Sequence, residues 1–267
     1  MLLAEVGDVE GHRSAIAPYF GLDTLGDAPK SIAPGILGVR LSAMAGQEAF
    51  GRSIIPSGPL IRAALRSSAL RKFMIAAPAF YELGLMYSLL TLLDATDRGT
   101  PLHPFIIIDM PATGHALALA DLPKTVLRLV PRGPVATAMR AGQAYLNDPK
   151  VTAAWIVTLP EHLPITEAIE LLEGLRKSAV PMGGIVLNRF LDDPFDDEER
   201  AALAHLLTKI PMHGEVLFQR IVMAREAAAR VKAAVDLPVL RLPDVGAREA
   251  QDIRQALTAK LMTAVAS

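Results

Sequence analysis

The chain has 267 residues, with 27 basic and 28 acidic side chains and a formal net charge of −1. This balance lacks the excess of basic residues that nucleic-acid binding needs, so we expect no nucleic-acid partner. Hydrophobic residues make up 51% of the chain, which supplies a buried core and excludes general disorder. There are no cysteines, which excludes disulfides and thiolate metal sites and fits a reducing compartment. We therefore expect a cytoplasmic protein.

One apolar stretch is long enough to raise the question of a membrane span. From Phe73 to Leu93 the only charged residue is Glu82, and this length reaches the threshold for crossing a bilayer. Pro78, Gly84 and a carboxylate near the middle of the stretch are unfavourable in lipid. We therefore predict a buried or groove-lining helix and no integral membrane span.

Short apolar runs predict buried strands along the chain. Each run is too short for a helix, and most are rich in Ile and Val. The predicted strands are Leu2–Val6, Phe105–Asp109, Trp155–Leu159, Gly184–Leu187 and Pro238–Leu242.

Helical patterns separate the later strands. They cover Glu167–Ser178, with Thr166 as N-cap, Asp196–Lys209, Val216–Val235 and Ala247–Val265. This alternation predicts an α/β fold, a parallel sheet with helices on both faces. Two stretches without a clear strand, at about 42–93 and 122–146, predict helical insertions that together form a helical subdomain. We expect a single domain over residues 1–267.

The most informative string begins at Phe105 and ends at His115, reading Phe-Ile-Ile-Ile-Asp-Met-Pro-Ala-Thr-Gly-His. Its apolar run delivers Asp109 to the carboxyl end of a strand, where open α/β sheets bind their ligands. In nucleotide hydrolases an Asp at this place holds Mg²⁺, usually through water. Thr113 and His115 add hydrogen-bonding groups after it, although His115 could also be an ordinary histidine at the start of a helix.

This string resembles the ArsA family, which comprises arsenite-pump ATPases and ATPases that target tail-anchored membrane proteins. The family's strand and switch II read D-x-A-P-T-G-H-T-L, and bacterial relatives carry the Pro-Ala-Thr-Gly-His form. Leu159–Glu167, Gly184–Arg189 and Leu237–Pro243 resemble further family segments in the same order. The resemblance covers nearly the whole chain. It implies a P-loop NTPase-like fold of the SIMIBI type, ATP or ADP with Mg²⁺ as cofactors, and a dimer.

The resemblance also implies roles for individual residues. Asp109 would hold Mg²⁺ through water, and Asp8 would position the attacking water, although Glu5–Gly11 departs from the family's D-P-A-H form. The implied cofactor-binding residues are Thr113, Gly114, His115, Asn188 and Pro243, of which the last two would form the adenine pocket. From the residues alone, the favoured interpretation of Asn188 is the start of a turn before Asp192 and Asp193.

The family's phosphate loop, K-G-G-x-G-K-[ST], is missing, and no Gly-Lys-Ser or Gly-Lys-Thr occurs in the sequence. Two explanations are open. The chain is an N-terminally shortened ATPase, or it is a paralogue without hydrolysis that pairs with an intact, P-loop-containing subunit. Either way, we expect low or absent ATP hydrolysis. Without a central strand, the strands on either side of it have backbone N–H and C=O groups without hydrogen-bond partners, and each buried one costs about 1–3 kcal/mol. These two strands must therefore pair with each other, or with a strand from elsewhere.

A second hypothesis is a non-catalytic binding module. Met44, Met74, Met86 and Met139 stand among many Leu and Ala residues in the helical insertions. Flexible thioethers suit a groove that holds an apolar helix, such as a membrane anchor. Ordinary helix packing is the plainer explanation of the same residues. An arsenite-pump subunit is disfavoured, because the family's metalloid site uses cysteines.

Overall fold

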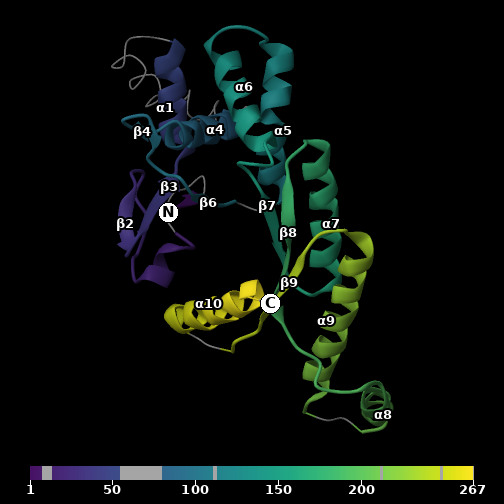
Figure 1. Cartoon of the computed structure of the whole chain (residues 1–267). Coiled ribbons are helices and arrows are strands. Elements are labelled where there is room, and N and C mark those ends of the chain that lie inside the picture. The colour runs from purple at the N-terminus through teal and green to yellow at the C-terminus, as the bar shows by residue number, and fades with distance from the viewer. Residues whose placement is uncertain (8–13, 55–79, 111–112, 211–212, 247–248, 267) are drawn as a thin grey trace, which may run out of the picture. The chain divides into compact units, whose positions relative to one another are not determined.

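The computed structural model describes residues 1–7, 14–54, 80–110, 113–210, 213–246 and 249–266. They form two compact units, each described by itself (Figure 1). The first contains Met1–Thr152 with Ser178–Val180, and the second contains Ala153–Lys177 with Pro181–Ser267. The fold is α/β and fits a P-loop NTPase-like architecture, as predicted.

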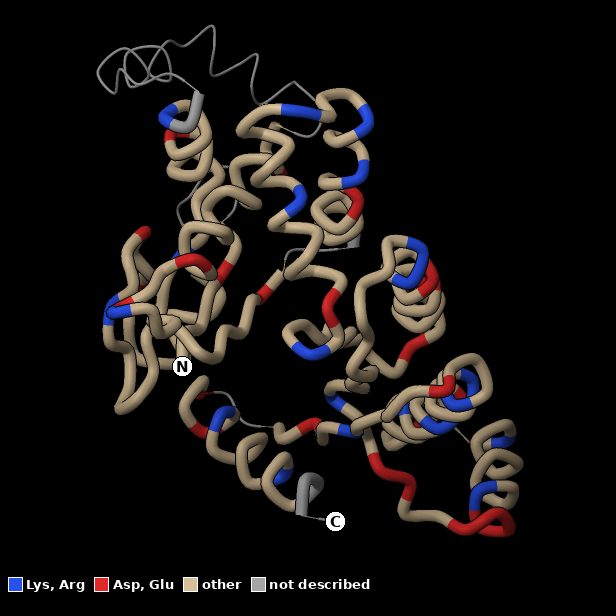
Figure 2. The backbone as a smooth tube through the Cα atoms, turned by 45° about the horizontal axis from the view of Figure 1, so that its top comes forward, with Lys and Arg blue, Asp and Glu red and all other residues tan. Residues whose placement is uncertain are grey.

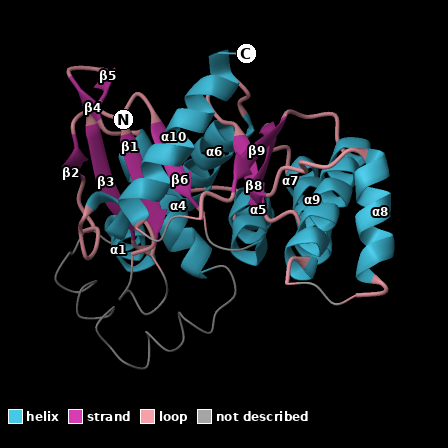
Figure 3. Ribbon diagram, turned by 90° about the horizontal axis from the view of Figure 1, so that it is seen from below, coloured by secondary structure: helices cyan, strands magenta, loops and turns pink. Residues whose placement is uncertain are grey.

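The first unit is built on a four-stranded sheet in the order β2-β3-β1-β6 (Figure 3). The central strand β1 (Leu2–Val6) runs parallel to both β3 (Ile36–Leu41) and β6 (Ile106–Asp109). The edge strand β2 (Lys30–Ala33) pairs antiparallel with β3, so the sheet is mixed rather than wholly parallel. A small separate hairpin joins β4 (Thr96–Asp97) and β5 (Thr100–Pro101).

Helices cover one face of this sheet. Leu2 and Ala4 of β1 belong to the same buried cluster as residues of α4 (Phe80–Leu93), α5 (Thr113–Leu129) and α6 (Pro134–Asn147). Helix α4 is apolar on all sides and almost completely buried, as expected of a helix inside a core. This confirms the predicted buried helix for residues 80–93. Among the described helices, none combines the length and the apolar character needed to cross a membrane.

Two glycines allow α4 to pack directly on α1 (Ala43–Ile54). A Cβ at Gly46 would lie 1.7 Å from the carbonyl oxygen of Gly84, and a Cβ at Gly84 would lie 2.2 Å from that of Ala43. The backbones of the two helices therefore touch where they cross. The predicted insertion at 42–93 contains both helices. The second insertion was misplaced at its start, because α5 already begins at Thr113 and accommodates Pro123 within it.

The second unit carries a parallel sheet in the order β7-β8-β9. Its strands are β7 (Ala154–Thr158), β8 (Met182–Phe190) and β9 (Val239–Pro243). A Cβ on either Gly183 or Gly184 of β8 would collide with the indole of Trp155, so these glycines make room for that ring on the neighbouring strand. Strand β8 is longer than predicted at both ends.

The helices of the second unit are α7 (His162–Lys177), α8 (Asp197–Leu207), α9 (Glu215–Ala234) and α10 (Ala250–Ala266). The predicted N-cap role of Thr166 was wrong. Its hydroxyl donates 3.0 Å to the carbonyl of His162, so Thr166 lies one turn inside α7. In contrast, Asp196 caps α8, because its carboxylate accepts from the Glu199 N–H and the Glu199 side chain accepts from the Asp196 N–H.

Both main sheets end in an open edge. β6 is the last strand of the first sheet and β7 the first strand of the parallel one, and no strand within the described ranges pairs with their outer edges. Phe105, just before β6, is 61% exposed, and Ile107, within β6, is 42% exposed. The two sheets are therefore separate, and the strands that flank the predicted gap are not hydrogen-bonded into one sheet.

Candidate functional site

Two carboxylates meet at the carboxyl end of the first sheet. Glu5 of β1 and Asp109 of β6 are direct partners in the parallel register. Glu5 is buried, whereas Asp109 is exposed to water and only partly desolvated. This desolvation, and secondly the negative charge of Glu5, raises the pKa of Asp109 above its ordinary value. Asp109 is thus the group at this rim that a cation would stabilise.

Glu5 is committed to the fold by its own hydrogen bonds. Its carboxylate accepts from the Ser14 hydroxyl and the Ala15 N–H, and from the Ile16 N–H at 3.3 Å. The Ser14 oxygen in turn accepts from the Ala17 N–H at 2.9 Å, at the start of a short 3₁₀ helix, η1 (Ala17–Phe20). Sequence reasoning named Glu5 but gave the carboxylate role to Asp8, which lies outside the described residues.

The predicted switch residues Thr113, Gly114 and His115 form the first turn of α5. The unpaired N–H groups at the start of a helix favour an anionic ligand. A Cβ at Gly114 would meet no atom within 4 Å, and its backbone is not left-handed. The fold therefore does not require glycine here, and the missing side chain leaves open space at the helix start.

His115 is held from α4. Its Nδ1 lies 3.0 Å from Oε1 of Glu82, a buried carboxylate in an otherwise apolar helix. The neighbouring Tyr81 ring lies 5.4 Å from the imidazole, centroid to centroid, and the Tyr81 hydroxyl donates to the carbonyl of Gly7 at 2.7 Å. Sequence reasoning missed this cluster, although a single carboxylate in an apolar stretch was a visible signal.

The two predicted adenine-pocket residues lie at the carboxyl ends of neighbouring strands in the second unit. Asn188 sits in a bulge near the end of β8, where Arg189 has a positive φ of 54° and its N–H donates to Oδ1 of Asn188 at 3.0 Å. Pro243 ends β9 and pairs with Phe190. Asn188 thus belongs to a strand rather than to a following turn, and its adenine role stays a prediction.

In the first unit, Asp109 offers a carboxylate of the kind that a hydrated Mg²⁺ binds, and the start of α5 offers N–H donors. In the second unit, the amide of Asn188 is a group of the kind that can pair with a base edge. The backbone cradle and the lysine that hold the β- and γ-phosphates have no counterpart in this sequence. No group of three or more His, Asp or Glu side chains in the described parts could hold a metal by itself.

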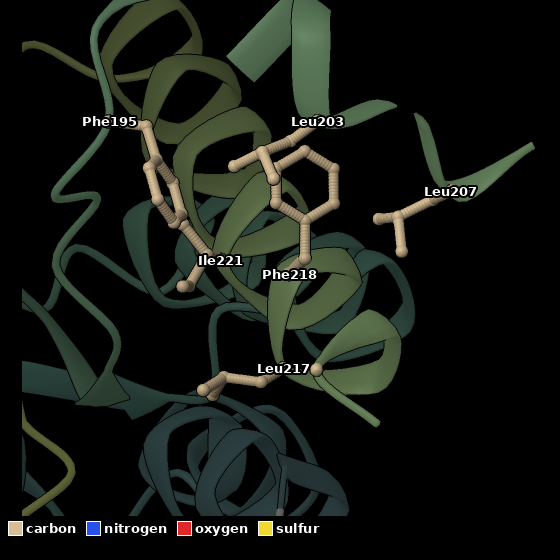
Figure 4. A pocket seen from close by; sticks show the side chains of 7 residues that line it. Phe195, Leu203, Leu207, Leu217, Phe218 and Ile221 are labelled. Atoms are coloured by element: carbon tan, nitrogen blue, oxygen red, sulfur yellow. The ribbon is translucent and has the colours of Figure 1, made fainter. Parts of the chain in front are cut away.

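An apolar pocket lies elsewhere, between α8 and α9 of the second unit (Figure 4). It measures about 190 Å³ and is lined by Phe195, Leu203, Leu207, Gly214, Leu217, Phe218 and Ile221. With no charged residue in its lining, the pocket offers no acid–base chemistry. The groove predicted from methionines is not this pocket. Met86 and Met139 are fully buried in the core of the first unit, Met44 is exposed, and Met74 lies outside the described residues.

The chain before α8 is rich in acidic residues (Figure 2). The Arg200 guanidinium bonds to Asp193 at 2.7 Å and to Asp197 at 2.6 Å, and Arg225 also reaches both carboxylates. Desolvation works against ionisation of Asp193, but hydrogen bonds from the Phe195 N–H and from these arginines outweigh it and lower its pKa. This network holds the approach to α8 in place and is structural.

Known proteins place these observations among ATPases. No family model matches the chain. Similar curated proteins are "ATPase BagA" and "Putative ATPase MT3781" of Mycobacterium tuberculosis and "Putative ATPase Mb3704" of Mycobacterium bovis. Each is 31% identical over 159 residues, which cover 54% of this chain and 46% of the relative. The chain spans about half the length of the curated relatives it matches, and over that part it is similar to proteins named as ATPases.

Proposed function

We propose that this chain is a cytoplasmic, ArsA-like nucleotide-binding protein that acts in a dimer. The observation that carries the proposal is Asp109, a carboxylate with a raised pKa at the carboxyl rim of the sheet, followed directly by the open first turn of α5. The ordered family-like segments and the similarity to proteins named as ATPases support it. The ligand would be ADP or ATP with Mg²⁺.

The phosphate loop would come from outside these 267 residues. The outer edge of β6 supports this, because a parallel strand added there would end beside Asp109. That strand belongs either to a longer version of the same protein or to a P-loop-containing partner subunit. The chain by itself should hydrolyse ATP at background rate, since losing even one donor that stabilises transition-state charge costs about 3–4 kcal/mol.

Calorimetric titration of the purified chain with ADP tests the proposal. We expect binding that tightens when Mg²⁺ is added, and an Asp109→Asn variant that binds ADP equally with and without Mg²⁺. Asn188→Ala should weaken binding of ADP more than that of GDP, by about tenfold for a lost base contact. Asp23→Asn, an exposed carboxylate before β2, is the control. No ADP binding at millimolar concentration, or the same Mg²⁺ dependence in the Asp109 variant, would refute this function.

The apolar pocket favours a second candidate function, the binding of an apolar helix from another protein. Leu217 and Val216 at its margin are 52% and 69% exposed, and α8 adds Leu206 on the outside. A fluorescent apolar helical peptide should bind the chain, and Leu217→Asp should abolish the binding. Leu163→Asp, at a still more exposed apolar position on α7 (67%), should leave it unchanged. Equal loss in both variants would show non-specific adsorption and remove this candidate.

A further inference from the structure

Glu82 is a buried carboxylate that the fold of α4 does not need. Every other residue of this helix is uncharged, and the side chain of Glu82 is only 10% exposed. A buried ionised group is costly unless another group compensates it. Within the described residues its partner is His115, whose Nδ1 lies 3.0 Å from Oε1. The pair therefore joins the core helix to the first turn of α5.

The contact selects one form of the imidazole. An ionised carboxylate only accepts hydrogen bonds, so Nδ1 must carry the proton that it donates to Glu82. In the neutral ring Nε2 is then the acceptor. The His115 side chain is 53% exposed, and Nε2 has no hydrogen bond to the described part of the protein. Nε2 is therefore the ring nitrogen that remains available as an acceptor.

Tyr81 fixes the same ring from another side. Its ring is tilted by 59° against the imidazole at 5.4 Å, and its hydroxyl is anchored 2.7 Å from the carbonyl oxygen of Gly7. Gly7 directly follows β1, and its N–H is held by the carbonyl of Leu41 at 3.1 Å. Two consecutive residues of α4 therefore connect the end of β1 with the start of α5.

We propose that Glu82 is a positioning residue that holds His115 as its Nδ1–H tautomer, with Nε2 presented at the sheet rim as an acceptor for water. Asp109 precedes His115 by six residues at the same rim and also accepts hydrogen bonds. Both groups suit the water shell of a bound cation. This last step rests on the proposed nucleotide function, whereas the tautomer does not.

The tautomer can be measured on the full chain. Long-range ¹H–¹⁵N correlation spectra of ¹⁵N-histidine-labelled protein distinguish a protonated Nδ1 from a protonated Nε2, and a His115→Gln variant assigns the signal. We expect the Nδ1–H pattern for His115. In Glu82→Leu, which replaces the buried charge by a side chain that suits the apolar helix, we expect the Nε2–H pattern. Glu48→Leu, on α1, serves as the matched control and should leave the signal unchanged.

A purely structural Glu82 would give a different result. If His115 shows the Nε2–H pattern in the unmodified chain, or keeps the Nδ1–H pattern in Glu82→Leu with the fold intact by circular dichroism, the proposal is overturned. Glu82→Gln, which keeps a neutral acceptor, offers a second variant should the Leu variant not fold, and it should show a mixture of tautomers.

Adding ADP with Mg²⁺ separates this inference from the proposed function. We expect the Nε2 resonance of His115 to shift on binding, and the affinity of Glu82→Leu to fall about tenfold, a loss typical of a charge-assisted hydrogen bond. If ADP does not bind but the tautomer responds to Glu82 as expected, the function fails and the positioning role stands. If ADP binds the unmodified chain and Glu82→Leu with equal affinity, the water-acceptor role of His115 is refuted.

Discussion

Asp109 and Glu5 show how the sheet places two like charges side by side. Parallel pairing of β1 with β6 puts them in the same register position, and neighbouring carboxylates hinder each other's ionisation. Glu5 is compensated by its hydrogen bonds to Ser14 and to two backbone N–H groups. Within the described ranges no group donates a hydrogen bond to Asp109, and its pKa is raised. The ionised form of Asp109 therefore lowers the stability of the folded protein.

This destabilising charge predicts that Asp109→Asn is more stable than the unmodified chain, by an amount that depends on pH. Because the pKa of Asp109 is higher in the folded state than in the unfolded state, the folded protein binds the proton more tightly. Stability is therefore lost as the pH rises from the unfolded pKa of 3.8 through the folded one. At pH 7 the variant should be more stable, by less than about 1 kcal/mol, because water screens an exposed carboxylate.

Urea unfolding at pH 7 and at pH 4 measures this effect. The gain should be present at pH 7 and shrink at pH 4, where the native carboxyl group is increasingly protonated. Asp23→Asn, an exposed carboxylate with no hydrogen bond or ion pair in the described structure, should show no gain at either pH. A stabilisation of Asp109→Asn that is the same at both pH values would contradict the electrostatic origin.

At the scale of elements, the crossing of α1 and α4 depends on its two glycines. Gly84→Ala places a methyl group where the Ala43 carbonyl lies, 2.2 Å from the new Cβ, so the helices must move apart. Overpacking of this kind costs about 1–3 kcal/mol or more. Gly114→Ala, where a Cβ meets nothing within 4 Å, should instead be neutral or stabilise α5 by up to about 1 kcal/mol. Thermal unfolding of both variants tests the pair, and equal destabilisation would contradict the close contact.

The elements that could be predicted are those whose signal is local. β1, β6, β7 and β9 follow from short, mainly apolar runs, and α8 follows from its acidic first turn. β3 was missed because Gly38 and Arg40 interrupt its apolar pattern. Gly38 nevertheless has a packing reason, since a Cβ there would come within 2.8 Å of the Ile32 side chain on β2. That constraint belongs to the partner strand and cannot be read from β3 alone.

The site divides in the same way. Asp109 could be predicted because it ends an apolar run. Glu82 and His115 were each visible in the sequence, but their contact could not be predicted, because the two residues are 33 positions apart and belong to different helices. Asn188 was placed correctly at the end of a strand region, but the bulge at Arg189 depends on how β8 pairs with β9. Tertiary pairing, rather than residue type, determines which of these side chains can act together.

At the scale of the whole molecule, each unit of this P-loop NTPase-like fold has its own sheet, and no described strand pairs with the outer edge of β6 in the first. The sequence leaves open whether the flanking strands join or borrow a strand, and the described strands form separate sheets. Similarity to proteins named as ATPases, over about half their length, supports the same family of folds.

The open edge of β6 has a practical consequence for anyone who produces this chain. An unpaired strand with exposed Phe105 and Ile107 can template the addition of strands from other copies, and neither residue is one of the charged or proline gatekeepers that usually prevent this. Expressed by itself, the polypeptide should aggregate as its concentration rises. Whatever segment completes the sheet would then also act as a solubility factor, and co-expression with it should increase the yield of dispersed protein.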